Sequence, residues 1–312
     1  MTGTGVRALV TGGAGFVGSH LVDRLLADGS SVCVVDDLST GSAGNVSPNA
    51  EFHRVDICDP TALHDVALRF RPAVVFHAAA QTDVRRSVRE PEFDARVNVV
   101  GGVNVLRAAA AAGARRIVYA SSAAVYGNPA RIPVSETEPT RPISEYGASK
   151  LAFEHYLGAY AARGLIEYAV LRYANVYGPR QRSDGEGGVV AIFTRQMLAG
   201  EPVTIFGDGA KTRDYVYVAD IVEATVRAAG AGGGPSGVVA NVGWGREVSD
   251  LELFRAVAAA AGYTRQPTYA PDRPGDVARS CLDGSLAQRT WDWRPSVPVA
   301  DGVRRVVEYA RA

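Results

Sequence analysis

Short apolar runs alternate with segments of helical periodicity through the first half of the chain. The apolar runs predict strands over Ala8–Thr11, Ser31–Asp36, Phe52–Val55, Val74–His77, Ile117–Ser121 and Tyr168–Arg172. Between them, apolar residues recur every three to four positions and predict helices over Phe16–Ala27, Thr61–Phe70, Phe93–Ala112 and Tyr146–Arg163. Strands that alternate with helices in this way predict an α/β fold, a doubly wound parallel sheet with helices on both faces.

The pattern changes after Asn175. Residues 178–188 are rich in Gly, Pro and charge, and the elements that follow do not alternate regularly. We therefore predict a large first domain over residues 1–174 and a smaller lobe over 175–312. Around residues 215–241 the chain is expected to return in part to the first domain, and the glycine-rich run 230–237 is expected to be a loop.

Composition narrows the class of function. The 33 basic and 33 acidic residues balance, so no overall field attracts nucleic acid or an anionic membrane. The three cysteines, Cys33, Cys58 and Cys281, lack the paired spacing of a zinc site or a disulfide framework and favour a reducing compartment. Without a signal-peptide pattern or a long apolar stretch, the expected location is the cytoplasm, and no metal is expected.

A glycine-rich segment joins the first predicted strand to the first predicted helix. In this context the glycines permit a tight turn, close approach of the backbone to a pyrophosphate, and close packing of helix against strand. The free N–H groups of the helix then face the phosphates. The segment predicts a dinucleotide-binding (Rossmann) site that includes Gly12, Gly15, Phe16, Val17 and Gly18.

Two acidic residues identify the expected dinucleotide. Asp36 and Asp37 end the second predicted strand, about 20 residues after the glycines, where a carboxylate binds the adenosine ribose hydroxyls. A carboxylate there repels a 2′-phosphate, so NAD is favoured over NADP. Asp56 and Ile57 follow the third strand, where Asp56 either meets the adenine edge or belongs to a simple turn.

Tyr146 and Lys150 stand four residues apart and so share one face of a helix. An ammonium near a phenol stabilises the phenolate and lowers its pKa, and a positively charged nicotinamide nearby would act in the same direction, so we expect Tyr146 to be a general base. Only two of the 33 basic residues are lysine, Lys150 and Lys211, and guanidinium does not replace ammonium at a tight site. This scarcity favours a functional role over a surface pair.

Two further polar residues end predicted strands. Ser122 follows the fifth strand at the carboxyl edge of the sheet, where it is either a partner of the reacting oxygen or a buried structural hydroxyl. His77 ends a buried strand and is expected to be a core histidine.

Taken together, these segments resemble the extended short-chain dehydrogenase/reductase superfamily and, within it, the bacterial UDP-glucose (UDP-galactose) 4-epimerases. The resemblance implies that Ser122, Tyr146 and Lys150 are catalytic and that Asp56, Ile57, Ala79 and Asn98 join the glycines at the cofactor. Its motifs run in the family's order through nearly the whole chain: TGGAGFVGSH, VVDDLSTG, HAAAQ, SSAAVYG, YGASK, LRYANVYGPRQ, EGGVVAIF, FGDG, RDYVYVADI and RPGDV.

The resemblance also distinguishes related activities. Nucleotide-sugar dehydratases carry acids where this chain has Ala123 and Ala124, and UDP-glucuronate decarboxylases carry a glutamate at the position of Ala124. Alanine cannot perform acid–base chemistry, so the expected reaction is epimerisation at C4 of a UDP-sugar. The expected substrate contacts are Ser122, Asn175, Arg182, Val189, Phe206, Arg213, Arg273, Asp276 and Ser280.

Alternatives remain for the sugar and for the activity. Arg182 resembles an arginine that UDP-glucuronate 4-epimerases place near the sugar carboxylate, although it is equally consistent with a solvent-facing loop. Ser280 stands where glucose-restricted enzymes often carry tyrosine, which makes UDP-N-acetylglucosamine a further candidate. An NAD-sensing regulatory protein would use the same fold. Related enzymes pair the helices matching Phe93–Ala112 and Tyr146–Arg163 across a two-fold axis, so a homodimer is expected.

Overall fold

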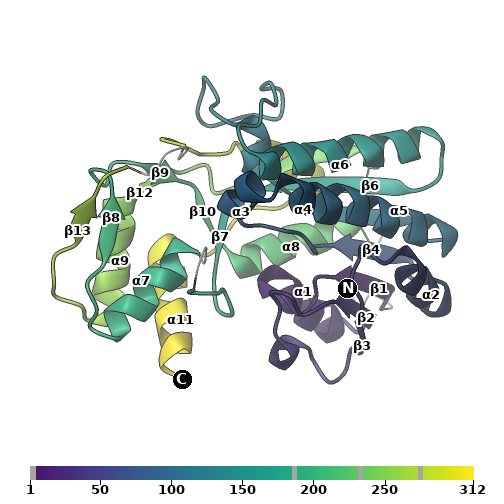
Figure 1. Ribbon diagram of the computed structural model, residues 1–312, viewed down its shortest axis with the longest axis horizontal. Coiled ribbons are helices and arrows are strands. Elements are labelled where there is room, and N and C mark those ends of the chain that lie inside the picture. The colour runs from purple at the N-terminus through teal and green to yellow at the C-terminus, as the bar shows by residue number, and fades with distance from the viewer. Residues whose placement is uncertain (1–4, 185–187, 231–234, 273–276) are drawn as a thin grey trace.

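The computed structural model describes residues 5–184, 188–230, 235–272 and 277–312. A large sheet flanked by helices occupies the right of Figure 1, and a smaller lobe occupies the left. Arg273 and Asp276, two of the predicted substrate contacts, lie outside the described residues. No helix in the described part of the chain has both the length and the apolar character needed to cross a membrane.

Seven parallel strands form the main sheet, and the sequence predicted six of them, all except β11. Their order is β11-β6-β5-β4-β1-β2-β3, so the direction of winding reverses between β1 and β4. The predicted strand ends are within one residue of those observed. The strands are β1 (Arg7–Thr11), β2 (Ser31–Asp36), β3 (Glu51–Arg54), β4 (Val74–His77), β5 (Arg116–Ser122), β6 (Glu167–Tyr173) and β11 (Val238–Val242).

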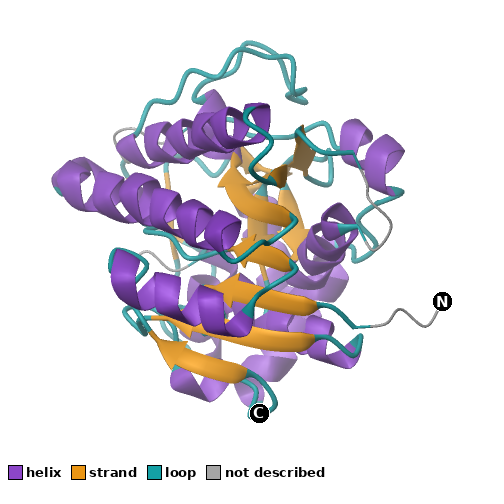
Figure 2. Ribbon diagram, turned by 90° about the vertical axis from the view of Figure 1, so that its right-hand side faces the viewer, coloured by secondary structure: helices purple, strands orange, loops and turns teal. Residues whose placement is uncertain are grey.

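Helices cover both faces of this sheet. Figure 2 shows the strands in orange with the helices in purple on either side. Apolar residues of α1 and α8 pack on one face, and those of α2, α5 and α6 on the other. The helices of this part are α1 (Phe16–Ala27), α2 (Pro60–Phe70), α3 (Val84–Arg89), α4 (Pro91–Ala95), α5 (Gly102–Ala111), α6 (Glu145–Ala162), α8 (Val218–Ala229) and α10 (Ser285–Trp291), with 3₁₀ turns η1 (Ala43–Asn45) and η3 (Ala123–Tyr126).

The helix predicted over Phe93–Ala112 is observed, but its hydrogen bonding is not α-helical throughout. The segment begins as α4, widens into the π-helix η2 (Arg96–Gly101), and continues as α5. Close packing accompanies the widening: a Cβ on Gly101 would lie 2.8 Å from the side chain of Ile57, and one on Gly102 would lie 2.8 Å from that of Phe153. A hydrophobic period of 3.6 residues does not reveal such a local change, and π-segments are frequent at functional sites.

The chain leaves the main sheet after β6 and later completes it. The edge strand β11 pairs with β6 along its whole length, from Val238 opposite Ala169 to Val242 opposite Tyr173. The helix before it, α8, packs against α1 and the sheet. The large sheet thus contains residues from both sides of position 175, and the domain boundary there stays a prediction.

The smaller lobe has its own apolar core. Aromatic and aliphatic residues of its helices and of β8 and β10 meet there, among them Phe193, Phe254 and Val303. The capping box of Ser249 and Glu252 starts one of these helices, and Gly262 in the left-handed conformation ends it. The lobe contains β7 (Asn175–Tyr177), α7 (Val189–Leu198), β8 (Thr204–Phe206), β9 (Thr212–Arg213), β10 (Tyr215–Tyr217), β12 (Val248–Ser249), α9 (Asp250–Ala261), β13 (Thr268–Ala270) and α11 (Val299–Arg311).

Candidate active site

A groove of ≈ 950 Å³ follows the carboxyl ends of the central strands. It lies at the reversal of winding between β1 and β4, which is where ligands bind in open α/β sheets. Most of the predicted cofactor contacts line it, together with two predicted substrate contacts: Gly12, Gly15, Phe16, Val17, Gly18, Asp36, Asp37, Asp56, Ile57, Ala79, Asn175 and Arg182.

The loop after β1 is too tight for side chains. Gly12 has φ +73°, and a Cβ on it would lie 2.6 Å from the backbone nitrogen of Ala79. A Cβ on Gly18 would lie 2.0 Å from the carbonyl oxygen of Gly12. Both contacts are with backbone atoms that cannot move aside, so the close approach of loop, helix α1 and strand β4 depends on these glycines.

The first turn of α1 meets the requirements of a phosphate site. Gly15 is its N-cap, and no side chain in the described part of the chain caps this end of the helix. The first N–H groups of the helix therefore remain available to an anion, and the helix dipole favours negative charge there. The residues present fit the pyrophosphate of a dinucleotide.

Asp36 is held in place by the loops on either side of it. One carboxylate oxygen accepts from the backbone N–H of Ala14 at 3.0 Å, and the other accepts from that of Leu38 at 2.8 Å. Burial raises the pKa of Asp36, while these two hydrogen bonds act in the opposite direction. Each oxygen keeps a lone pair for further donors, as the predicted contact with ribose hydroxyls requires.

We expect the purified protein to release NAD, and no NADP, when it is denatured. Asp36→Asn removes the charge that repels a 2′-phosphate, so the preference for NAD over NADP should fall by about tenfold or more. Titration with both nucleotides, followed by tryptophan fluorescence, measures this preference. Asp28→Asn is the matched control, because Asp28 is the C-cap of α1, pairs with Arg24 and does not line the groove. NADP in the wild-type protein would contradict the assignment.

The other predicted cofactor residues lie around the same groove. Asp56 is exposed and accepts from the N–H of Cys58 at 2.8 Å. Asn98 is buried on η2, where its amide accepts from the N–H of Gln81 at 2.8 Å and donates to the Ser149 hydroxyl at 3.0 Å. Asn98 thus joins the segment after β4 to the helix that carries Tyr146 and Lys150.

The three predicted catalytic residues come together from β5 and α6. Ser122 ends β5, and Tyr146 lies in the first turn of α6, whose N-cap is Ser144. The Lys150 ammonium donates to the carbonyl oxygen of Ala120 at 2.9 Å and lies 5.9 Å from the centre of the Tyr146 ring. Strand β5 positions both the hydroxyl of Ser122 and the anchor of Lys150.

The protein groups by themselves do not lower the pKa of Tyr146. The pKa of Tyr146 is raised, because burial outweighs the hydrogen bond with Ser122 that lowers it, and the charge of Asp94 raises it further. Burial also lowers the pKa of Lys150 to about 8, although Asp94 and Glu154 act in the opposite direction. The cationic nicotinamide of the expected cofactor would be a further positive charge that favours the phenolate.

His77 is a core histidine, as the sequence suggested. Its ring is hydrogen-bonded to the hydroxyl of Thr11 at 2.8 Å and stacks on Tyr119 at 5.5 Å between centres. Burial lowers the pKa of His77 to about 3, so the ring is neutral at physiological pH.

The predicted substrate contacts divide between the groove and the lobe. Val189 begins α7, Phe206 ends β8, and Arg213 ends β9. The Ser280 N–H donates to the carbonyl oxygen of Thr212, so this residue lies beside β9. Arg182 is exposed and forms an ion pair with Asp184 at 2.7 Å. These contacts with substrate stay predictions.

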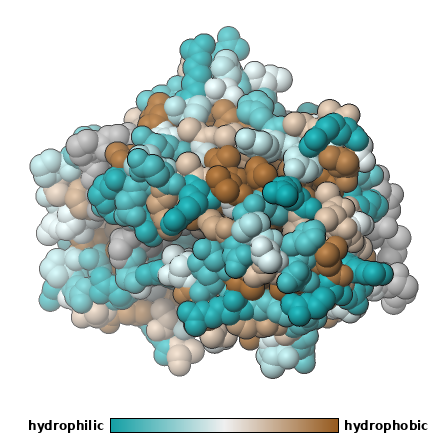
Figure 3. Space-filling view, turned by 45° about the vertical axis from the view of Figure 1, so that its right-hand side comes forward, coloured by the Kyte–Doolittle hydropathy of each residue, from teal (hydrophilic) through white to brown (hydrophobic). Residues whose placement is uncertain are grey.

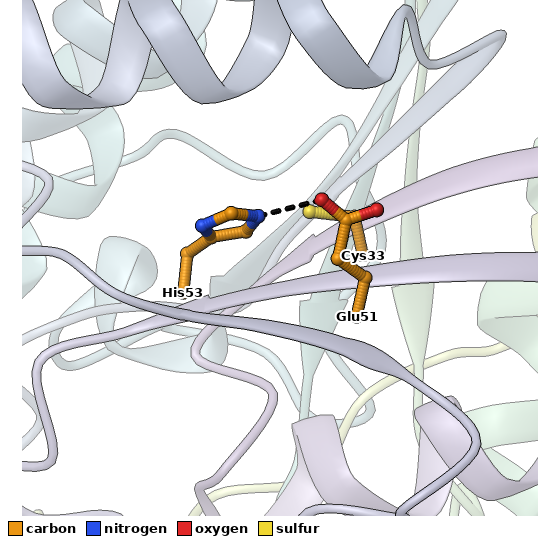
Figure 4. Close-up of side chains that lie close together, drawn as sticks. All are labelled: Cys33, Glu51 and His53. Atoms are coloured by element: carbon orange, nitrogen blue, oxygen red, sulfur yellow. Dashed lines mark hydrogen bonds and ion pairs between the residues drawn. The ribbon is translucent and has the colours of Figure 1, made fainter.

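Sequence reasoning missed a group of three side chains that contain metal-ligand atoms. Cys33, Glu51 and His53 come from neighbouring strands β2 and β3, with ligand atoms within 4.8 Å of one another (Figure 4). Only the register, with Cys33 opposite Glu51, brings them together. Glu51 and His53 already hydrogen-bond each other at 2.7 Å, and burial raises the pKa of the Cys33 thiol to about 12. We therefore assign no metal to this group.

Comparison with known proteins agrees with this geometry. Residues 8–243 match the model of the NAD dependent epimerase/dehydratase family. The chain is 49% identical to a UDP-glucose 4-epimerase of Mycolicibacterium smegmatis, with 98% of this chain and 99% of that protein covered.

Two solved structures have nearly the same fold. A UDP-glucose 4-epimerase of Thermotoga maritima with UDP-glucose gives a TM-score of 0.94 at 44% identity and covers 97% of this chain and 98% of its own. A UDP-glucose 4-epimerase of Thermus thermophilus in complex with NAD gives 0.92 at 44% identity and covers 98% and 99%.

Proposed function

Since this chain belongs to the NAD dependent epimerase/dehydratase family, we propose that it inverts the C4 hydroxyl of a UDP-hexose, with UDP-glucose and UDP-galactose as the pair it interconverts. The observation that carries the proposal is the meeting of Ser122, Tyr146 and Lys150 at the carboxyl edge of β5, beside the groove suited to a dinucleotide. Ala123 and Ala124 follow Ser122 and provide no acid for elimination or decarboxylation.

The groove would hold NAD, which would supply the hydride acceptor and donor for the sugar carbon. Tyr146 takes the proton of the reacting hydroxyl and later gives it back, as a general base and then a general acid. Ser122 donates a hydrogen bond to the same oxygen. Lys150 holds an ammonium 5.9 Å from the centre of the Tyr146 ring, and a bound nicotinamide cation would add a second positive charge that favours the phenolate.

The lobe is proposed to hold the UDP group. Arg213 on β9 is a donor for the diphosphate, because a guanidinium forms charge-assisted hydrogen bonds with phosphate oxygens. Asn175 on β7 lines the groove, and Val189 on α7 directly follows Gly188, which also lines it. The keto-sugar must turn over in the site so that its other face meets the hydride donor. The UDP group, and not the sugar ring, must therefore contribute most of the binding free energy.

Incubation of the purified protein with a panel of UDP-sugars tests the proposal. We expect UDP-galactose and UDP-glucose to interconvert without added cofactor, and chromatography separates the two. UDP-glucuronate is the second candidate because Arg182 lines the groove, although its ion pair with Asp184 already engages the guanidinium. If the protein binds NAD but converts none of the UDP-sugars, the proposal is overturned and an NAD-sensing role is favoured.

We expect UDP-N-acetylglucosamine to be at least a slow substrate, because Ser280 leaves open the space that a tyrosine would fill. Two neighbours that could occupy this space are engaged elsewhere. Arg279 is paired with Glu247 at 2.5 Å, and Tyr177 is buried in the core of the lobe. Ser280→Tyr should remove this activity and leave UDP-galactose turnover within about twofold. If the wild-type protein turns over UDP-galactose but never the acetamido sugar, the open-space argument fails.

We propose a homodimer that pairs helices α5 and α6 of two subunits. Exposed apolar side chains occur near these helices, among them Val84, Val88, Val100 and Tyr156. Figure 3 shows hydrophobic groups near the middle of an otherwise largely hydrophilic face. Light scattering at low micromolar concentration should give about twice the chain mass of 32.9 kDa. Val100→Glu should shift the mass toward one chain, whereas Leu68→Glu, on exposed α2, should not.

A further inference from the structure

Lys150 is a buried cation, so its protonated form depends on the charged groups around it. Groups from four elements act on it or contact it. Helix α6 provides Tyr146 and Glu154, strand β4 provides His77, strand β5 provides Tyr119, and helix α4 provides Asp94.

Most of these groups carry no free negative charge. His77 is neutral, and burial raises the pKa of Tyr119 well above its ordinary value, so its phenol stays protonated. Glu154 is an anion, but Arg172 binds it at 2.6 Å and the Ser121 hydroxyl donates to it at 2.6 Å. The charge of Glu154 is therefore largely balanced by a guanidinium of its own.

Asp94 differs from Glu154 in its partners. It is fully buried, and one of its oxygens accepts only from the neutral amides of Gln81 at 2.8 Å and Asn98 at 3.1 Å. Its other oxygen, Oδ2, is buried and accepts no hydrogen bond within the described ranges of the chain. Nor does any cation of those ranges form an ion pair with it. A buried carboxylate is costly without a counter-charge, and Lys150 is the cation whose charge it favours.

A hydrogen-bonded chain fixes Asp94 relative to α6. The Asn98 amide donates both to Asp94 and to the hydroxyl of Ser149, which lies next to Lys150 in the sequence. Gln81 completes the chain, because its N–H donates to Asn98 and its side chain donates to Asp94. The π-segment η2 carries Asn98, so the widened helix places the amide between the carboxylate and α6.

We infer that Asp94 is a positioning residue for the proposed epimerase reaction. Its negative charge keeps Lys150 an ammonium beside Tyr146. The effect on turnover rests on the proposed function, whereas the effect on the charge of Lys150 does not. The same charge raises the pKa of both Tyr146 and Lys150. Its removal should therefore move both titrations in one direction, toward lower pH.

Asp94→Asn keeps the shape of the side chain and removes the charge. In the pH profile of turnover by the NAD-loaded protein, where the nicotinamide cation would lower the pKa of Tyr146, we expect the acid limb to report Tyr146 and the alkaline limb to report Lys150. We expect both limbs to move down by on the order of one pH unit. Asp94→Glu keeps the charge and should keep the wild-type midpoints even if its maximum rate is lower. Asp220→Asn is the matched control, because Asp220 is also buried but binds Ser296 and Val297.

A direct titration of Lys150 tests the same inference without catalysis. The chain contains only two lysines, so protein labelled with ¹³C-lysine gives two side-chain signals, and Lys211→Arg assigns them. The Lys150 signal should titrate near pH 8 in the wild-type protein and lower in Asp94→Asn. An unchanged Lys150 midpoint together with a rate reduced equally at every pH would overturn the inference. If the wild-type protein has no epimerase activity, the proposed function is overturned. The NMR titration would still decide whether Asp94 sets the pKa of Lys150.

Discussion

Tyr146→Phe should reduce turnover of UDP-galactose by roughly 10²–10⁴-fold, because the ring remains but the proton acceptor is lost. The hydroxyl is the only group removed, and the packing of the first turn of α6 is expected to persist. Steady-state rates at saturating UDP-galactose measure the effect, and the amount of NAD released on denaturation shows whether the cofactor site is intact.

Tyr156→Phe is the matched control on the same helix. Its side chain is 44% exposed, and we expect turnover within about twofold of wild type because surface changes of this kind have small effects. A Tyr146→Phe protein that retains more than a tenth of wild-type turnover would remove Tyr146 from the role of base.

Lys150→Arg should reduce turnover by about 10²-fold or more even though the charge is kept. The Lys150 ammonium lies between the carbonyl oxygen of Ala120, at 2.9 Å, and the ring of Tyr119, 4.9 Å from its centre. A guanidinium is larger and planar, and it cannot occupy this buried position without displacing the strand or the ring. Stopped assays over minutes to hours cover the expected range of rates.

The other lysine of the chain provides the control for this substitution. Lys211 forms an ion pair with Asp272, whose side chain is largely exposed, and a guanidinium can form the same ion pair. Lys211→Arg should therefore turn over UDP-galactose at close to the wild-type rate. Near-normal activity of Lys150→Arg would mean that the rarity of lysine in this chain has no bearing on catalysis.

The sheet and the cofactor groove follow closely from the sequence. Val74–His77 is predicted and observed with the same ends, because a fully buried parallel strand is a continuous apolar run. The glycines after β1 are equally predictable, since backbone atoms as close as those of Ala79 exclude every other residue type at Gly12. Local rules suffice where the backbone itself determines the residue.

The electrostatics of the site could not be predicted in the same way. The sequence places Lys150 one turn from Tyr146 but gives no measure of burial, and burial dominates the pKa of both groups. Asp94 had a weak signal, since it stands four residues before Asn98 on a predicted helix face. Its approach to α6 depends on the π-segment, which hydrophobic periodicity does not show. Cys33 and Glu51 likewise meet only through the register of β2 and β3.

The late completion of the main sheet has a consequence during synthesis. Strand β6 emerges from the ribosome with one edge unpaired, and β11, which covers that edge, is made roughly 65 residues later, after several seconds of translation. During this interval the nascent chain presents an open row of backbone donors and acceptors to other nascent chains. A chain cut short between β6 and β11 would keep this edge open and would be prone to aggregation.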